Sequence, residues 1–190
     1  MTRDLMYRGQ IEELVTDSYR ALDRPDGPAL GFYSEEERRS VPEDAGQWAL
    51  GVGNPFPHAH LRAGETVLDL GCGSGFDVLL AANQVGETGR AIGVDMLPEM
   101  IERASRNAAE GGMTNTEFVV GMMDDLPLPD DSVDVVISNG SINLAARKSR
   151  VFAEARRVLK PGGRLCVTDL TLDETELPTE ILTHPSAWAG

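Results

Sequence analysis

The sequence predicts an α/β fold with a mostly parallel sheet, and three observations lead to that prediction. From about residue 64 onward, short runs rich in β-branched residues alternate with segments of helical periodicity. The first of these runs leads through a glycine-rich turn directly into a helix. The chain has 190 residues, of which 41% are hydrophobic and 25% charged, as expected for one ordinary domain.

Composition and charge exclude several classes of partner. The 17 basic and 31 acidic residues give a net charge of −14, so the phosphates of nucleic acids and anionic membrane surfaces would be repelled. No apolar run approaches the roughly 20 residues that cross a bilayer, and the first residues lack the pattern of a secretory signal. We therefore expect a cytoplasmic protein. Cys72 and Cys166 lie far apart and outside any Cys-x-x-Cys motif, which favours reduced packing residues over a metal site or a disulfide.

The first 62 residues are expected to form a helical extension with a lid. Apolar residues recur at helical spacing over residues 5–22, and the prolines and glycine of residues 25–28 end that helix. Residues 34–39 begin with a serine and carry an acid three positions later, the pattern of a capped short helix. Residues 51–57 are too rich in glycine and proline for a helix or a central strand, so a loop or lid is predicted there.

Residues 63–172 are predicted to form the core and residues 173–190 a short tail. The expected strands are 66–70, 91–95, 117–120, 133–138 and 164–169. The expected helices between them are 76–85, 98–110 and 147–159. The Lys-Pro-Gly-Gly segment at 160–163 is expected to end the last helix before the final strand begins.

The turn after the first strand has the character of a cofactor site. Residues 69–75 read Asp-Leu-Gly-Cys-Gly-Ser-Gly and lead into a helix, whose N-terminus offers free backbone amides. Asp95 ends the second strand 20 residues beyond Gly75, where an acid accepts hydrogen bonds from ribose hydroxyls. The dinucleotide fingerprint Gly-x-Gly-x-x-Gly would need glycine at Phe76. The motif therefore predicts a nucleoside cofactor other than a dinucleotide.

Five motifs in order carry a family resemblance: DLGCGSG, GVD, the loop at 121–127, SVDVVISN and VLKPGGRL. Over about residues 60–172 the chain resembles the Rossmann-like S-adenosylmethionine-dependent methyltransferases. The resemblance implies a Rossmann-like sandwich with S-adenosylmethionine as the cofactor. It also implies the cofactor-binding residues, which are Asp69, Gly71, Cys72, Gly73, Gly75, Asp95, Met96, Met122, Met123, Asp124 and Asn139.

One position departs from that family pattern. Relatives usually carry an acid after the glycine of the fourth motif, where it accepts from the adenine amino group, and here Met122 stands there. We expect adenine to be held mainly by apolar contact and by the backbone of Met123, with Asp124 as a possible substitute. Weaker discrimination of adenine should follow.

A narrower resemblance points to the arsenite methyltransferases. It rests on Tyr-Ser-Glu-Glu-Glu at 33–37, the segment 50–55, the segment 137–144 and the closing Trp-Ala-Gly. Those enzymes capture trivalent arsenic through cysteine thiolates. The matching positions here are Val52 and Gly140, and a third cysteine would follow Gly190. We therefore expect a substrate other than arsenite.

The end of the chain predicts a shortened sheet. Only about 20 residues follow the fifth strand, with space for one short helix at 174–183 but not for the further strands of the family. The truncated C-terminal strands should leave an edge that the N-terminal helix or a second copy of the chain covers. A homodimer is therefore a possible assembly.

Several residues are candidates for catalysis. Asn139 stands at the end of the fourth strand, where it could orient the methionine arm, and Tyr19 and Tyr33 flank the expected lid. His58 and His60 could act as a general base if the lid closes. Tyrosine packing and loop histidines without a special role are the alternative interpretations.

Three functions remain open. The first is an S-adenosylmethionine-dependent methyltransferase that acts on a small molecule. The second is a cyclase or lyase that folds the aminobutyrate arm of S-adenosylmethionine and releases methylthioadenosine with a small-ring amino acid. The third is a non-catalytic cofactor-binding partner protein.

Overall fold

The computed structural model describes residues 2–22 and 26–171 and contains one five-stranded sheet. Its order is β3-β2-β1-β4-β5, and every neighbouring pair is parallel. The predicted α/β class with a mostly parallel sheet is confirmed. The strands are β1 Thr66–Leu70, β2 Arg90–Asp95, β3 Thr116–Val120, β4 Val133–Asn139 and β5 Leu159–Thr168.

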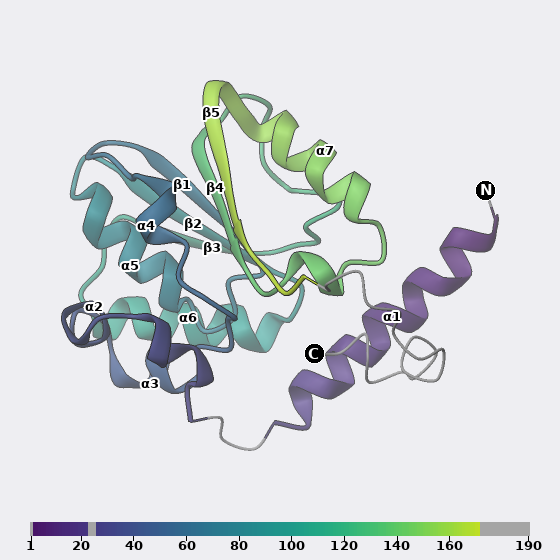
Figure 1. Cartoon of the computed structure of the whole chain (residues 1–190), viewed down its shortest axis with the longest axis horizontal. Coiled ribbons are helices and arrows are strands. Elements are labelled where there is room, and N and C mark those ends of the chain that lie inside the picture. Colours follow the sequence, from purple (N-terminus) through teal and green to yellow (C-terminus); the bar gives the residue numbers. More distant parts are fainter. Residues whose placement is uncertain (1, 23–25, 172–190) are drawn as a thin grey trace.

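Helices cover both faces of this sheet (Figure 1). α5 (Phe76–Val85) and α6 (Pro98–Glu110) lie on one face, and α7 (Lys148–Val158) lies on the other. α5 and α6 have the bounds that the sequence predicts, and α7 is one residue shorter at each end. The chain runs outward from β1 through β2 to β3 and then returns to add β4 on the other side of β1. The crossover helices therefore switch from one face of the sheet to the other between β1 and β4.

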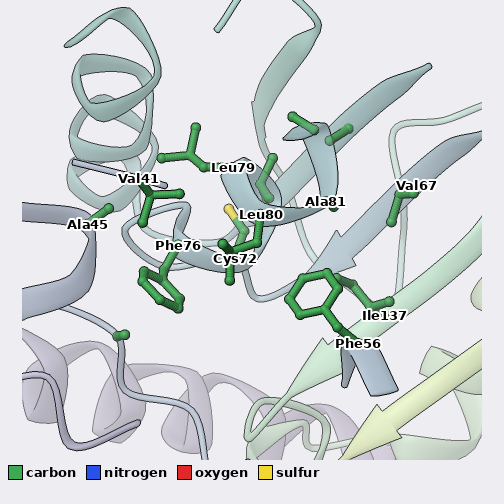
Figure 2. Close-up of a cluster of buried hydrophobic side chains, with 14 of the residues drawn as sticks. Val41, Ala45, Phe56, Val67, Cys72, Phe76, Leu79, Leu80, Ala81 and Ile137 are labelled. Atoms are coloured by element: carbon green, nitrogen blue, oxygen red, sulfur yellow. The ribbon is translucent and has the colours of Figure 1, made fainter. Parts of the chain in front are cut away.

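Two apolar layers hold the helices to the sheet because successive strand side chains point to opposite faces. Val67 and Ile137 pack with the apolar residues of α5, as Figure 2 shows. Their neighbours Leu68 and Val136 belong to the layer beneath α7. Burial on both faces explains why the central strands are almost continuously apolar.

The N-terminal part is helical and wraps one end of the core. It contains α1 Thr2–Arg20, a 3₁₀ turn η1 at Pro28–Phe32, α2 Glu35–Arg39, α3 Glu43–Gln47 and α4 Phe56–Ala59. The predicted capping box of α2 is confirmed, since Ser34 and Glu37 exchange side-chain to backbone hydrogen bonds. In α1, Val15 is buried and Leu14 is exposed, and Leu22, which the sequence also places on the apolar face, is exposed beyond the end of the helix.

The segment 160–163 does not separate α7 from β5, which corrects the sequence interpretation. β5 begins at Leu159, directly after α7, and Leu159 pairs with Val133 while Arg164 pairs with Val135. The four intervening residues therefore form a bulge opposite Asp134. Lys160 in that bulge donates to the Asp134 carboxylate, with Nζ 2.8 and 2.9 Å from its oxygens.

β5 forms one edge of the described sheet. Leu165 and Val167 are 37% and 38% exposed there. The short 3₁₀ turn η2 at Ile142–Leu144 follows β4. The predicted helix at 174–183 lies outside the described residues.

Candidate functional site

A cavity opens at the carboxyl ends of β1, β2 and β4. Its walls come from the turn after β1, the end of β2, the loop at 121–124 and the residues after β4. α1 lies across its mouth and contributes Glu12, Val15 and Tyr19, which are spaced so that they share one side of the helix. In open parallel sheets, ligands usually bind outside the carboxyl ends of the strands, at the point where the strand order reverses.

Most of the residues singled out in the sequence line this cavity. They are Tyr19, Tyr33, Asp69, Gly71, Cys72, Gly73, Asp95, Met96, Met122, Met123, Asp124 and Asn139. Gly75 and His58 are not among its lining residues. The topology thus brings together segments of the chain that lie more than 100 residues apart.

Gly75 has a packing role instead. Its φ of +85° and its place at the start of α5 suit glycine, and an added Cβ would lie 2.9 Å from the Cβ of Ala104. The residue therefore lets α5 approach α6 closely. His58 is exposed on α4, as is His60 at the end of that helix, so neither is placed to act on a ligand in the cavity.

The cavity is anionic. Its described lining contains no Lys, Arg or His but does contain Glu12, Asp69, Asp77 and Asp95, together with Asp124, whose charge Arg147 balances. Asp69 is only 3% exposed, and its carboxylate receives no hydrogen bond from the described residues. Burial, with the nearby Asp77 and Asp95, raises the pKa of Asp69 well above its usual range. Because this mostly buried carboxylate opens onto the cavity and has no donor among the described residues, its position favours a cationic ligand group or a proton.

Asp95 fixes the glycine-rich turn. Its two carboxylate oxygens accept from the backbone N–H groups of Gly73 and Leu97, each at 2.9 Å. Each oxygen keeps a further lone pair for a ligand hydroxyl. Tyr19 of α1 lines the same cavity, and burial, followed by the nearby charges of Asp95 and Asp169, raises the pKa of its hydroxyl. The Tyr19 hydroxyl therefore keeps its proton and is not available as a base.

Asn139 joins the lid to the core. Its Oδ1 accepts from the N–H groups of Val52 and Gly53 at 2.9 and 3.2 Å. Its Nδ2 donates toward the Gly53 carbonyl at 2.8 Å, the Tyr33 hydroxyl at 2.9 Å and Oδ2 of Asp77 at 3.1 Å. Two N–H groups thus serve three acceptors. The segment predicted to be a lid is held against the end of β4 by this one carboxamide.

Asp77 is the site residue that the sequence interpretation missed. It lies in the first turn of α5, is 8% exposed, and accepts a 2.6 Å hydrogen bond from the Tyr33 hydroxyl. Burial raises the pKa of Asp77 to about 6, although the bonds from Tyr33 and Asn139 oppose the rise. Burial and the same carboxylate raise the pKa of Tyr33, so Tyr33 does not ionise to serve as a base on its own.

The loop at 121–124 presents methionine side chains. Met122 and Met123 line the cavity, while Asp124 is buried and its Oδ2 accepts from Arg147 at 2.8 and 3.1 Å. The ion pair with Arg147 engages the Asp124 carboxylate, which was the possible substitute for the adenine-binding acid that Met122 replaces. This loop therefore offers mainly apolar and backbone contacts.

Val52 and Gly140 lie against each other, at the two positions where the resemblance to arsenite methyltransferases implies cysteines. A Cβ added to Gly140 would be 3.3 Å from Cγ1 of Val52. Gly140 also has a φ of +76°, which disfavours a side chain there. Burial raises the pKa of Cys72 well above its usual range and also that of Cys166, so both thiols resist ionisation.

Neither a metal centre nor a membrane-spanning helix is found among the described residues 2–22 and 26–171. They contain no group of three or more His, Cys, Asp or Glu side chains that could hold a metal ion. None of their helices is both long and apolar enough to span a membrane.

A model of the methyltransferase domain matches residues 61–189. The chain belongs to the methyltransferase domain family. It is 46% identical over 158 residues to an arsenite methyltransferase from Halobacterium salinarum, covering 83% of this chain and 40% of that protein. It is 38% identical over 195 residues to a human arsenite methyltransferase, covering 96% of this chain and 50% of that protein.

Among solved structures, an arsenic(III) S-adenosylmethionine methyltransferase from Chlamydomonas reinhardtii is similar, with a TM-score of 0.72 and 39% identity. That match covers 82% of this chain and 55% of the other. The chain therefore spans about half the length of these relatives. The Rossmann-like methyltransferase fold that the motifs imply is confirmed.

Proposed function

We propose that this chain binds S-adenosylmethionine in the anionic cavity and transfers its methyl group to a small acceptor other than arsenite. The observation that carries the proposal is Asp69, a buried carboxylate without a hydrogen-bond donor in the described structure. S-adenosylmethionine bears an ammonium and a sulfonium, and the cavity has acids but no described basic residue to repel them. Family membership and the names of the relatives support the same cofactor.

Different residues of the cavity bind different parts of the cofactor. Asp69 holds the ammonium, and the free amides at the start of α5 suit the carboxylate. Asp95 accepts from the ribose hydroxyls, and Met122 and Met123 pack on the adenine. When bound, S-adenosylmethionine supplies a methyl group that its sulfonium has already activated. The protein's task is then to orient an acceptor and to exclude water.

The acceptor side argues against arsenite. Capture of a soft, thiophilic centre needs thiolates, and Val52 and Gly140 contribute none. Cys72 and Cys166 keep their protons because their pKa values are raised. The carboxamide of Asn139 and the lid segment instead close over a site bounded by Tyr33 and Asp77. Such a site suits a small organic molecule.

Mass spectrometry of the nucleosides formed from S-adenosylmethionine tests the reaction. Incubation with the cofactor alone should leave it intact and bound, and S-adenosylhomocysteine should form only when an acceptor is added. Methylthioadenosine above the non-enzymatic background would instead establish the cyclase or lyase alternative. Binding without S-adenosylhomocysteine formation with any acceptor would support the non-catalytic alternative.

A further inference from the structure

The acceptor end of the cavity carries a negative charge that the cofactor does not use. Asp69 is committed to the cofactor ammonium under the proposed function, but Asp77 also lines the cavity and pairs with no basic side chain in the described part of the chain. Its donors are the neutral Tyr33 hydroxyl and a share of the Asn139 amide. The carboxylate is therefore hydrogen-bonded but not neutralised.

We propose that the acceptor is an amine and that the Tyr33–Asp77 pair removes its proton. This inference rests on the proposed function and names the substrate class of the same site. A ligand ammonium would supply the positive charge that Asp77 lacks, and the walls formed by Ala29, Ala49 and Phe76 suit an apolar body attached to it. Anionic acceptors would meet uncompensated repulsion from Asp77 in a poorly solvated site.

The proton can leave through Tyr33. Its hydroxyl donates to Asp77 at 2.6 Å and accepts from Asn139 at 2.9 Å, which leaves a lone pair for one ligand N–H. The ammonium gives its proton to the Tyr33 oxygen as the tyrosine proton passes to the Asp77 carboxylate. The freed nitrogen lone pair forms the N–C bond to the methyl group while the S–C bond breaks and its electron pair stays on sulfur. Asp77 later returns the proton to solvent.

The ionisation properties of Tyr33 and Asp77 suit these two roles, one as proton relay and the other as proton acceptor. Tyr33 is 5% exposed and remains un-ionised, so it relays a proton rather than storing one. Asp77, with its carboxylate, can store it. Asn139 holds both groups and the lid backbone in place, so binding of the acceptor and closure of residues 52 and 53 depend on the same carboxamide.

Probes of similar hydrocarbon structure but different charge test the proposal on the full chain. Benzylamine, benzyl alcohol and benzoate all carry a phenyl ring, and butylamine, butanol and butyrate all carry a short alkyl chain. Each is incubated with the protein and S-adenosylmethionine labelled with ¹³C on the methyl group, and NMR detects the labelled product. The expected result is an N-methyl signal from an amine in either set and none from its carboxylate. Methylation of a carboxylate or an alcohol in preference to the amine, or no methylation of either amine, would overturn the proposal.

Variants separate proton removal from a structural effect. Tyr33→Phe and Asp77→Asn should each lower kcat for the reactive amine at least about tenfold while KM changes by about twofold or less. Glu36→Gln, on an exposed position of α2, is the matched control and should leave both constants unchanged. Equal kcat in Tyr33→Phe and the parent would contradict the relay. Calorimetry with S-adenosylmethionine keeps the two proposals apart, since cofactor binding without amine methylation rejects only this inference.

Discussion

The Tyr33 hydroxyl donates a 2.6 Å hydrogen bond to Asp77, which lies 44 residues further along the chain. Tyr33 precedes α2 in the N-terminal extension, and Asp77 belongs to the first turn of α5 in the core. The bond therefore joins the part of the chain that covers the cavity to the part that forms its floor. Asn139 completes the connection from β4.

Stability should depend on the ionisation of Asp77. Its pKa is raised from 3.8 to about 6 by burial, so the folded protein binds more protons than the unfolded chain in that interval. The free energy of unfolding should therefore fall as the pH rises from about 4 to about 6. Urea unfolding across this range is the measurement, and Asp77→Asn should make the fall less steep, the remainder coming from Asp69 and Asp95, whose pKa values are also raised. Asp69 and Glu37 are the charged groups that act with Asp77, and Tyr33 is the neutral titratable group that donates to it.

The matched control for that titration is Glu36→Gln, which removes an exposed acid from α2. It should keep the pH dependence of the parent. A parent protein whose stability is level over the same interval, or a variant Asp77→Asn that retains the full slope, would show that Asp77 does not carry the effect.

Asn139→Ala should loosen the lid. The change removes the acceptor of two lid N–H groups and the donor to Tyr33 and Asp77. We expect a loss of unfolding free energy on the order of 2 to 4 kcal/mol, because buried partners are left without hydrogen bonds. Asn143→Ala is the control, since that side chain bonds Asp169 and Leu170 at an exposed site, and it should cost less than about 1 kcal/mol. Equal losses would argue against the network.

Asp95→Ala should weaken S-adenosylmethionine binding. The ribose hydroxyls lose their acceptor and the Gly73 turn loses its support, which together cost about 1 to 3 kcal/mol. Isothermal titration calorimetry measures the change, with Asp125→Ala at an exposed position outside the cavity lining as the control. Unchanged affinity in Asp95→Ala would refute the assignment of the ribose end.

Restoring two thiols should not restore arsenic chemistry. In the double variant Val52→Cys, Gly140→Cys the new side chains are adjacent, because a Cβ at position 140 lies 3.3 Å from Cγ1 of Val52. Position 140 has a φ of +76°, which strains any side chain, and Cys72 and Cys166 resist ionisation. No methylated arsenic should be detected by mass spectrometry after incubation with arsenite and S-adenosylmethionine. Efficient methylation would mean that the acceptor site has been misread.

The sheet could be predicted from sequence because its signals are local. Strand β1 leads into a glycine-rich turn, and Pro98 starts α6, so both bounds follow from neighbouring residues. The β5 bulge was misread because proline and glycine at 161–163 also end helices, and only pairing with β4 distinguishes the two. Asp77 was missed for a similar reason. An acid in the first turn of a helix is common, and its bond to Tyr33 is not visible in the order of residues.

Titration of the protein with S-adenosylmethionine, in parallel with Asp69→Asn and the control Asp125→Asn, tests the central claim most directly. The account predicts one cofactor per chain, unchanged affinity in the control, and an affinity at least about tenfold weaker in Asp69→Asn, or about 1.4 kcal/mol. The loss follows from removing the buried carboxylate that holds the ammonium. No binding by the parent protein, or equal affinity in Asp69→Asn, would contradict it.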